Sequence, residues 1–256
     1  MRLLSVLTVC VAMAGPAYGW GPIGHRTTGA IAENHLNEKA QAAIRDLLGP
    51  ETLAEAATWP DDMRSNPDPF WQKTASSWHY VTVPHGKSYE AVGAPDRGDA
   101  ITALEQFSRT VTDESAPLAD RQLALRFIVH IIGDLHQPLH VGNGTDRGGN
   151  DVKLKWFGKD SNLHSVWDSG LIDFEKLSYS ELSAWLDSKI TPEQVAQWSN
   201  TDPDIWMAES AALRDQIYPE SGDLSWTYRY ENVPHVKTRL SMGGIRIASY
   251  LNALFQ

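Results

Sequence analysis

The sequence predicts a mostly α-helical protein, folded as one domain with a short β-hairpin. Helix-capping signals recur along the whole chain, and apolar residues follow helical spacing far more often than strand alternation. No linker, low-complexity run or internal repeat divides residues 20–256. A chain of this length can bury a sizeable core without being split into separate domains.

The helices are predicted from their start and stop signals, in chain order. Pro22 can occupy the first turn of a helix that runs toward His35, and Asn37 can cap a helix over 38–48 that Gly49-Pro50 ends. Helices are also expected over 99–111, from an N-cap at Asp120, after the capping box 178–181, after the N-caps at 191 and 202, and over 236–255. Strand alternation is confined to 78–83 and 152–156.

The first nineteen residues predict a signal peptide that is removed after Gly19. Arg2 supplies the positive charge, residues 3–13 form an apolar stretch too short to span a bilayer, and Ala17-Tyr18-Gly19 is a small-x-small cleavage site. Cleavage would make Trp20 the N-terminus and remove Cys10, the only cysteine, which lacks the small preceding residue of a lipid anchor. We expect a secreted or periplasmic protein without disulfides, in which metal ions can replace covalent links.

The charge of the chain restricts its partners. The formal net charge is −10, and it becomes −11 when Arg2 is lost with the leader. This charge is unfavourable for binding nucleic acid, because phosphate affinity normally comes from Lys and Arg. Bound divalent cations could reverse the local field. No other segment approaches the length of a membrane helix, so no membrane association is expected.

The stretch from His130 to His140 contains the strongest indication of chemistry. His130 and Asp134 stand one helical turn apart in an apolar run, so both side chains project from the same face and could hold one metal ion. Pro138 should end or kink the helix and free His140 for a different ion. A buried His–Asp pair that satisfies itself is the simpler interpretation of an isolated pair, because unpaired buried polar groups are costly.

Further residues extend this indication. His164 and Asp168 repeat the four-residue spacing, and the recurrence favours metal binding over a single structural pair. Imidazole with carboxylate favours zinc over magnesium or calcium, and a chain without mature cysteine cannot form an all-cysteine zinc site. Taken alone, three other positions have ordinary explanations: His25 near the new N-terminus, Asp61 in a Pro-Asp-Asp loop, and His79 on a strand.

Taken together, these motifs resemble those of a known family. The residues are Trp20 with His25, Trp59-Pro60-Asp61, Trp78-His79-Tyr80, His130-x-x-Gly133-Asp134-x-x-Gln137-Pro138-Leu139-His140, Gly148-Gly149-Asn150 and Asn162-Leu163-His164-x-x-Trp167-Asp168. The pattern is similar to that of the zinc-dependent single-strand-specific nucleases of plants, fungi and bacteria, the S1/P1 type, which share a fold with bacterial zinc phospholipase C. The resemblance runs from position 20 to about position 172, and the chain is identified as a bacterial member.

The resemblance implies three zinc ions per chain in one cleft. One ion would be held by Asp61, His79, His130 and Asp134. A second would take the amine and carbonyl of Trp20, His25 and the other oxygen of Asp134, so that Asp134 bridges the pair. The third would use His140, His164 and Asp168. The four remaining histidines match no ligand position: His35, His85, His136 and His235.

The implied reaction is hydrolysis of RNA and single-stranded DNA to 5'-phosphate products, with 3'-mononucleotides as further substrates. A zinc-bound water would be the nucleophile, because paired zinc ions roughly 3.5 to 4 Å apart lower the pKa of a shared water. Tyr80 occupies the position of a base-stacking aromatic, and a stacked base is worth about 1 to 3 kcal/mol. Asn150 and Lys87 are expected to contact substrate. Tyr80 could equally be core packing, Asn150 a turn residue and Lys87 a solvated charge.

Two departures from the family leave properties open. The chain lacks the disulfides of eukaryotic members, and Thr82 and Pro84 stand where fungal enzymes carry acidic residues that read the base. Base preference and pH optimum are therefore not predicted. The alternatives are a zinc phospholipase C, disfavoured by Tyr80 and by the lack of an apolar docking loop, and a non-catalytic zinc-binding protein, which would not need a bridging carboxylate. Nothing in the sequence requires more than a monomer.

Overall fold

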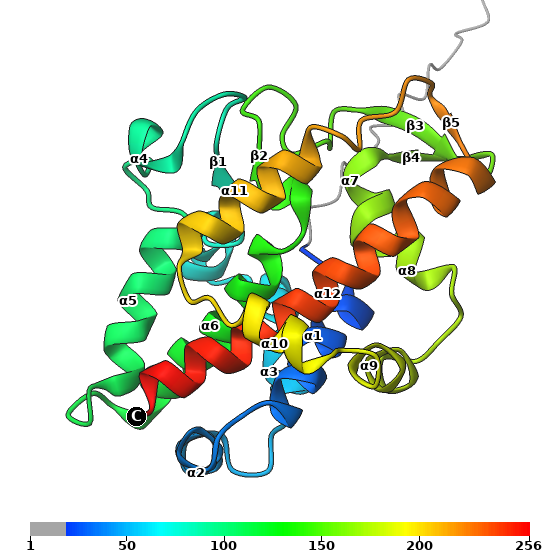
Figure 1. The fold of residues 1–256 in the computed structure, drawn as a ribbon. Coiled ribbons are helices and arrows are strands. Elements are labelled where there is room, and N and C mark those ends of the chain that lie inside the picture. The colour runs from blue at the N-terminus through cyan, green and yellow to red at the C-terminus, as the bar shows by residue number, and fades with distance from the viewer. Residues whose placement is uncertain (1–18) are drawn as a thin grey trace, which may run out of the picture.

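The structure is a computed structural model that describes residues 19–256. Cys10 and the predicted leader, apart from Gly19, lie outside the described residues. Helices make up most of the described chain (Figure 1): α1 (Pro22–Asn34), α2 (Glu38–Leu48), α3 (Leu53–Asp62), α4 (Tyr89–Val92), α5 (Ala100–Thr112), α6 (Leu118–Leu135), α7 (Leu163–Ser165), α8 (Leu171–Asp173), α9 (Tyr179–Asp187), α10 (Pro192–Trp198), α11 (Pro203–Arg214) and α12 (Trp226–Leu254). No helix within residues 19–256 has both the length and the apolar character needed to cross a membrane.

Five short strands form two small sheets: β1 (Val81–Thr82), β2 (Val141–Gly142), β3 (Lys153–Trp156), β4 (Lys159–Asn162) and β5 (Asp223–Leu224). Strands β1 and β2 pair in parallel. Strands β3 and β4 form an antiparallel hairpin, of which only the first strand was predicted, and β5 adds to β3 in parallel. Short 3-10 or π turns also lie at Met63–Ser65, Phe70–Thr74, Ala75–Ser77, Pro138–His140 and Val166–Gly170.

The helices pack around two apolar cores. One core joins α3, α5 and α6 through residues such as Leu53, Leu104 and Phe127, and the other joins the hairpin, α7 to α9 and α12 through residues such as Trp167 and Leu240. Helix α1 contributes to both cores and lies between α3, α9 and α12. The longest helix, α12, crosses the molecule diagonally (Figure 1). Helix α1, which carries the predicted ligand His25, therefore lies where the two cores meet, next to α6 of the first core.

Most predicted helix ends are confirmed. Asn37 accepts a hydrogen bond from the Ala40 amide at the start of α2, and Asp99 caps α5 with its carboxylate. The capping box at Ser178 and the N-caps at 191 and 202 are also present. As predicted, the helix that carries His130 ends before Pro138, and a 3-10 turn follows. At these positions the capping side chains and proline were sufficient to predict where the helices begin and end.

Two helix starts differ from the prediction. Helix α6 begins at Leu118 after Pro117, and Asp120 lies in its first turn instead of capping it. An acidic residue is equally favourable there, because it faces the positive end of the helix dipole. Helix α12 begins at Trp226, ten residues before the predicted start, and continues through Pro234. Its early turns are anchored by Tyr228, whose hydroxyl accepts from Trp167 and donates to the Ile217 carbonyl.

Two site residues also lie in elements that the sequence did not predict. His79 was expected on a strand over 78–83, but the strand covers only Val81–Thr82, and His79 lies in the turn that follows a 3-10 helix. Asp61 was expected in a loop, but it lies in the last turn of α3, next to a proline inside the helix. The capping box at Thr52 and the buried face of α3 stabilise this helix past Pro60.

Gly29 permits the close approach of α1 to α3. A Cβ atom at this position would lie 2.4 Å from the Leu53 carbonyl oxygen, which is backbone and cannot move aside cheaply. We expect Gly29→Ala to lower the free energy of unfolding by about 1 to 3 kcal/mol, as overpacking usually does. Denaturant unfolding of both proteins measures this difference. Gly222→Ala is the matched control, because a Cβ there meets nothing within 4 Å; equal losses in the two variants would contradict a packing role for Gly29.

Candidate metal centre

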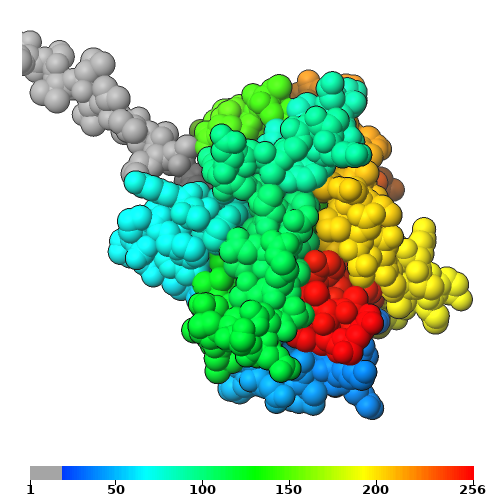
Figure 2. Space-filling model, turned by 90° about the vertical axis from the view of Figure 1, so that its left-hand side faces the viewer, coloured from blue at the N-terminus to red at the C-terminus, as the bar shows by residue number. Residues whose placement is uncertain are grey.

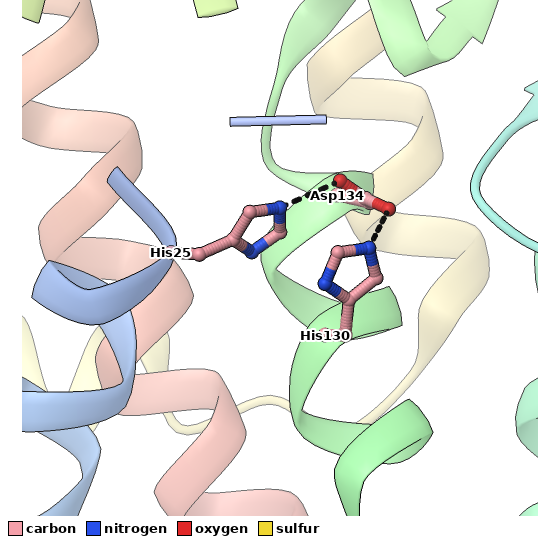
Figure 3. A group of neighbouring side chains, drawn as sticks. All are labelled: His25, His130 and Asp134. Carbon is pink, nitrogen blue, oxygen red and sulfur yellow. Dashed lines mark ion pairs between the residues drawn. The ribbon is translucent and has the colours of Figure 1, made fainter. Parts of the chain in front are cut away.

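Asp134 lies at the centre of the first buried cluster (Figure 3). His130 and Asp134 come from successive turns of α6, and His25 reaches them from α1. Asp134 Oδ1 is 3.3 Å from His25 Nε2, and Asp134 Oδ2 is 2.9 Å from His130 Nε2. One carboxylate thus faces a different imidazole with each oxygen. This is the arrangement that a carboxylate bridging two metal ions requires.

Asp61 and His79 complete this cluster from the other side. His79 Nδ1 lies 3.3 Å from Asp134 Oδ2, 3.7 Å from Asp61 Oδ1 and 2.7 Å from His130 Nε2. One donor atom from each of Asp61, His79 and His130 falls within a common 4.8 Å, as does one from each of His25, His130 and Asp134. These distances would allow two neighbouring cations that share the Asp134 carboxylate, one on each oxygen.

The third predicted ligand group forms a separate cluster. Donor atoms of His140, His164 and Asp168 lie within 4.8 Å of one another, and His164 Nε2 is 3.1 Å from Asp168 Oδ2. His164 and Asp168 lie on one continuous helical stretch formed by α7 and the π turn, so their four-residue spacing acts as the sequence predicts. The other oxygen of Asp168 accepts a hydrogen bond from Gln137 Nε2 at 2.5 Å.

Backbone carbonyls orient three of the imidazoles. The Nδ1–H groups of His130, His140 and His164 donate to the carbonyls of Ala57, His79 and Gly148, respectively, at 2.7, 2.5 and 2.6 Å. A carbonyl can only accept, so each ring must carry a proton on Nδ1, and Nε2 is the ring nitrogen left to bind a metal. This second layer of hydrogen bonds is typical of metal-binding histidines.

Several buried polar atoms of the first cluster lack hydrogen-bond partners among the described residues. Both carboxylate oxygens of Asp134 and both ring nitrogens of His25 are buried without a well-directed hydrogen bond from the described residues. Such groups cost free energy unless a partner or an ion satisfies them. A divalent cation fits this set of donors. All three groups combine imidazole with carboxylate. Their residues are buried, except for Asp61, which is partly exposed.

The pKa shifts follow from burial and close opposite charges. Burial opposes the charged form of Asp134, but the His130 imidazole holds the pKa of this carboxyl well below its usual range. Burial likewise opposes the charge on His130, but Asp134 and Asp61 raise the pKa of His130 to about 9. Burial lowers the pKa of His25 and raises the pKa of Asp168. Burial thus disfavours the charged form of these donors, and a proton on one imidazole stabilises the neighbouring carboxylate. A bound cation would replace that proton as the positive partner of the carboxylates.

The backbone before Trp20 lies against this cluster. Trp20 is fully buried, and the Gly21 amide donates to the Asp168 carbonyl at 2.7 Å. A Cβ atom on Gly19 would lie 1.6 Å from Asp134 Oδ1 and 2.8 Å from His25 Nε2. The backbone at residues 19–21 is thus placed beside side chains that are predicted to hold the second ion. In the uncleaved chain the Trp20 nitrogen is an amide, so the predicted amine ligand stays a prediction.

A cavity of about 420 Å³ opens onto two of the clusters and is lined by His79, His140 and His164. Two of the predicted substrate contacts, Tyr80 and Asn150, line the same cavity, whereas Lys87 is exposed on a loop and does not. Three arginines that the sequence did not indicate also line it: Arg64, Arg97 and Arg147. Only the fold brings these cations together, because they come from three distant segments.

The four remaining histidines lie outside the clusters. His35 and His85 each contact a carboxylate at 2.7 Å, that of Asp187 and of Asp215. His136 is buried, donates from Nδ1 to the Ile132 carbonyl and faces Arg246 with Nε2. His235 is exposed on α12. This agrees with their predicted exclusion from the ligand set.

Comparison with known proteins agrees with the fold and the clusters. A family model described as S1/P1 Nuclease matches residues 20–256. The chain is 32% identical to Endonuclease 2 of Arabidopsis thaliana, covering 99% of this chain and 97% of that protein. It is 28% identical to Nuclease S1 of Aspergillus oryzae, with 99% and 98% covered, and 27% identical to Nuclease P1 of Penicillium citrinum, with 92% and 97% covered. The chain therefore belongs to the S1/P1 nuclease family, as its motifs predicted, and is a phosphodiester-cleaving hydrolase that acts on nucleic acids.

Proposed function

We propose that this nuclease is a zinc-dependent endonuclease that hydrolyses RNA and single-stranded DNA, together with 3'-mononucleotides, and leaves 5'-phosphates. The observation that supports this best is the meeting of three His/Asp clusters beside one 420 Å³ cavity: His79, His140 and His164 line the cavity, and the buried group of His25, His130 and Asp134 adjoins His79. The membership of the family supports the reaction, and the donor set supports zinc.

Nine residues would hold three zinc ions. Asp134 would bridge the first two, and the third ion would lie in the separate cluster. When bound, the ions supply Lewis acidity and a water nucleophile at neutral pH. The complete ligand set is Trp20, His25, Asp61, His79, His130, Asp134, His140, His164 and Asp168.

The protein's own side chains would bind and orient the substrate. Arg64 lies at the cavity wall with Nη1 3.4 Å from Asp61 Oδ1, where its charge can contact a phosphate held beside the first cluster. Arg97 and Arg147 add positive charge around the cavity of an otherwise acidic protein. This local concentration answers the objection that a net charge of −10 disfavours nucleic acid, because binding depends on the field at the cleft.

Preference for single strands would come from Tyr80. Its half-buried ring adjoins His79 and lines the cavity, where an unpaired base can stack on it. Bases in a duplex are already stacked on one another and gain less. Asn150 lines the same cavity and would contact the substrate backbone. Its side-chain amide donates to the Arg147 carbonyl at 2.9 Å. Lys87 would act only on a longer substrate that extends beyond the cavity.

We further propose that the protein acts as a monomer after export to the periplasm or the medium, with Trp20 exposed by cleavage after Gly19. The signal-like composition of residues 1–19 supports export. Mass spectrometry of the secreted protein measures the N-terminus directly. A first residue other than Trp20 would contradict this cleavage site.

Removing the metal should abolish activity. We expect close to three zinc ions per cleaved chain by elemental analysis, and release of acid-soluble nucleotides from RNA and single-stranded DNA faster than from duplex DNA. A chelator should stop the release, and added zinc should restore it, because the donors have no other way to activate water. Chelation should also lower the melting temperature, since the buried donors would lose their partner.

Other results would contradict the proposal in distinct ways. Fewer than two zinc ions per chain would exclude a bridged pair. Three zinc ions without nuclease activity would point to the phospholipase alternative, which hydrolysis of phosphatidylcholine tests. Zinc loss with no hydrolytic activity on either substrate would favour a zinc-binding protein without catalysis.

A further inference from the structure

A second recess adjoins the metal-lined cavity. Its volume is about 280 Å³, and it lies between β1 and the segment that joins α4 to α5. Figure 2 shows the side of the molecule that carries α4 and α5, with the segment around α4 at the top and α5 below it. Its walls are largely apolar side chains, contributed by Val81, Val92, Ala94 and Pro95. A narrow apolar recess beside a polar cavity suits a flat ring better than a phosphate or a sugar.

The Tyr80–Arg97 pair forms the wall between the recess and the cavity. Both residues line both spaces, and an Arg97 Nη2–H group donates to the Tyr80 hydroxyl at 2.6 Å. The contact fixes the edge of the ring that would stack a base. A guanidinium carries five N–H donors in a rigid fork, and the contact with Tyr80 takes one of them.

The acidic residue in the recess does not compete for these donors. Asp99 is buried, and its carboxylate accepts from the Tyr89 hydroxyl at 2.9 and 2.8 Å and from the amides of Ile101 and Thr102 at the start of α5. Its oxygens are therefore committed to local structure. The charge of Arg97, which is exposed, is left to act on whatever enters from solvent.

We propose that the recess is the subsite for one nucleobase next to the scissile phosphate, and that Arg97 is a specificity-determining residue that favours guanine there. This inference rests on the proposed nuclease function. Guanine presents two acceptors, O6 and N7, on one edge, which matches a guanidinium fork. Adenine presents an amino donor in place of O6, so the same fork would lose one hydrogen bond and face an N–H group.

The experiment compares four dinucleoside monophosphates, GpT, ApT, TpG and TpA, with the cleaved, zinc-loaded enzyme. We expect kcat/KM to favour guanine over adenine by about fivefold or more at one of the two positions, since a good Arg–guanine pair discriminates by about 1 to 3 kcal/mol. In Arg97→Ala and in Arg97→Lys this ratio should fall to about one. Lysine keeps the charge but not the fork, so it separates base recognition from attraction of phosphate.

Arg147→Ala is the matched control, because Arg147 lines the cavity but not the recess. Its loss should lower the rates for guanine and adenine substrates equally and leave their ratio unchanged. Zinc content and melting temperature verify that each variant is folded and loaded.

Three results would overturn the inference. The first is a wild-type guanine-to-adenine ratio near one at both positions; the second is a ratio that survives in Arg97→Ala, and the third is a ratio that Arg97→Lys fully retains. In each case hydrolysis of the dinucleotides would still support the nuclease function. Failure of the wild-type enzyme to hydrolyse any of these dinucleotides, RNA or single-stranded DNA would instead overturn the proposed function and the inference with it.

Discussion

Asp134→Asn should reduce the zinc content from three ions to one per chain and lower the rate of single-strand hydrolysis by more than about 100-fold. Even residues that only orient metal ligands cost 10- to 100-fold when replaced, so a bridging ligand should cost more. Asparagine has nearly the same shape but is neutral and offers one oxygen. Two adjacent cations would lose the fully buried carboxylate that lies between His25 and His130. Elemental analysis and nucleotide release from single-stranded DNA measure both effects.

Asp62→Asn provides the control for this prediction. The substitution makes the same change in charge as Asp134→Asn. Asp62 directly follows Asp61, but its side chain is exposed. It should keep three zinc ions and the wild-type rate. If Asp134→Asn retained two or more ions, the bridging role of Asp134 would be wrong. That result would say nothing against the separate cluster of His140, His164 and Asp168.

A form of the protein that keeps Gly19 in front of Trp20 should bind one zinc ion fewer and lose at least about tenfold in rate. The nitrogen of Trp20 would then be an amide, which carries no lone pair for a metal. The extra residue would also lie against Asp134, since a Cβ atom built on Gly19 would come 1.6 Å from Asp134 Oδ1. The two effects act on the same ion, which also depends on His25.

A cleaved form with one extra residue after Gln256 is the control for chain extension, because Gln256 is exposed. That form should match the cleaved protein in zinc content and rate. Equal zinc content in the form with Gly19 would show that Trp20 is not a ligand. That result would leave the roles of Asp134 and of the third cluster intact.

The sequence by itself determined the features that depend on neighbouring residues. Side-chain caps such as Asn37 and Ser178 begin helices where predicted, since each needs only the amides two or three positions onward. The spacing of His130 with Asp134, and of His164 with Asp168, places each pair on one helical face. These pairs, together with the family motifs, were enough to predict the His/Asp clusters and the nuclease family.

Only the tertiary structure decided the features that depend on distant segments. Helix α12 begins at Trp226 and continues through Pro234, and its first turns are held by the contacts of Tyr228 with Trp167 and Ile217, which no local pattern reveals. Arg97 lies seventeen positions from Tyr80, and its contact with the Tyr80 hydroxyl exists only because the segment before α5 folds back onto β1. The physical reason is that caps and helical spacing act within one or two turns, whereas burial and the meeting of charges depend on how all the helices pack.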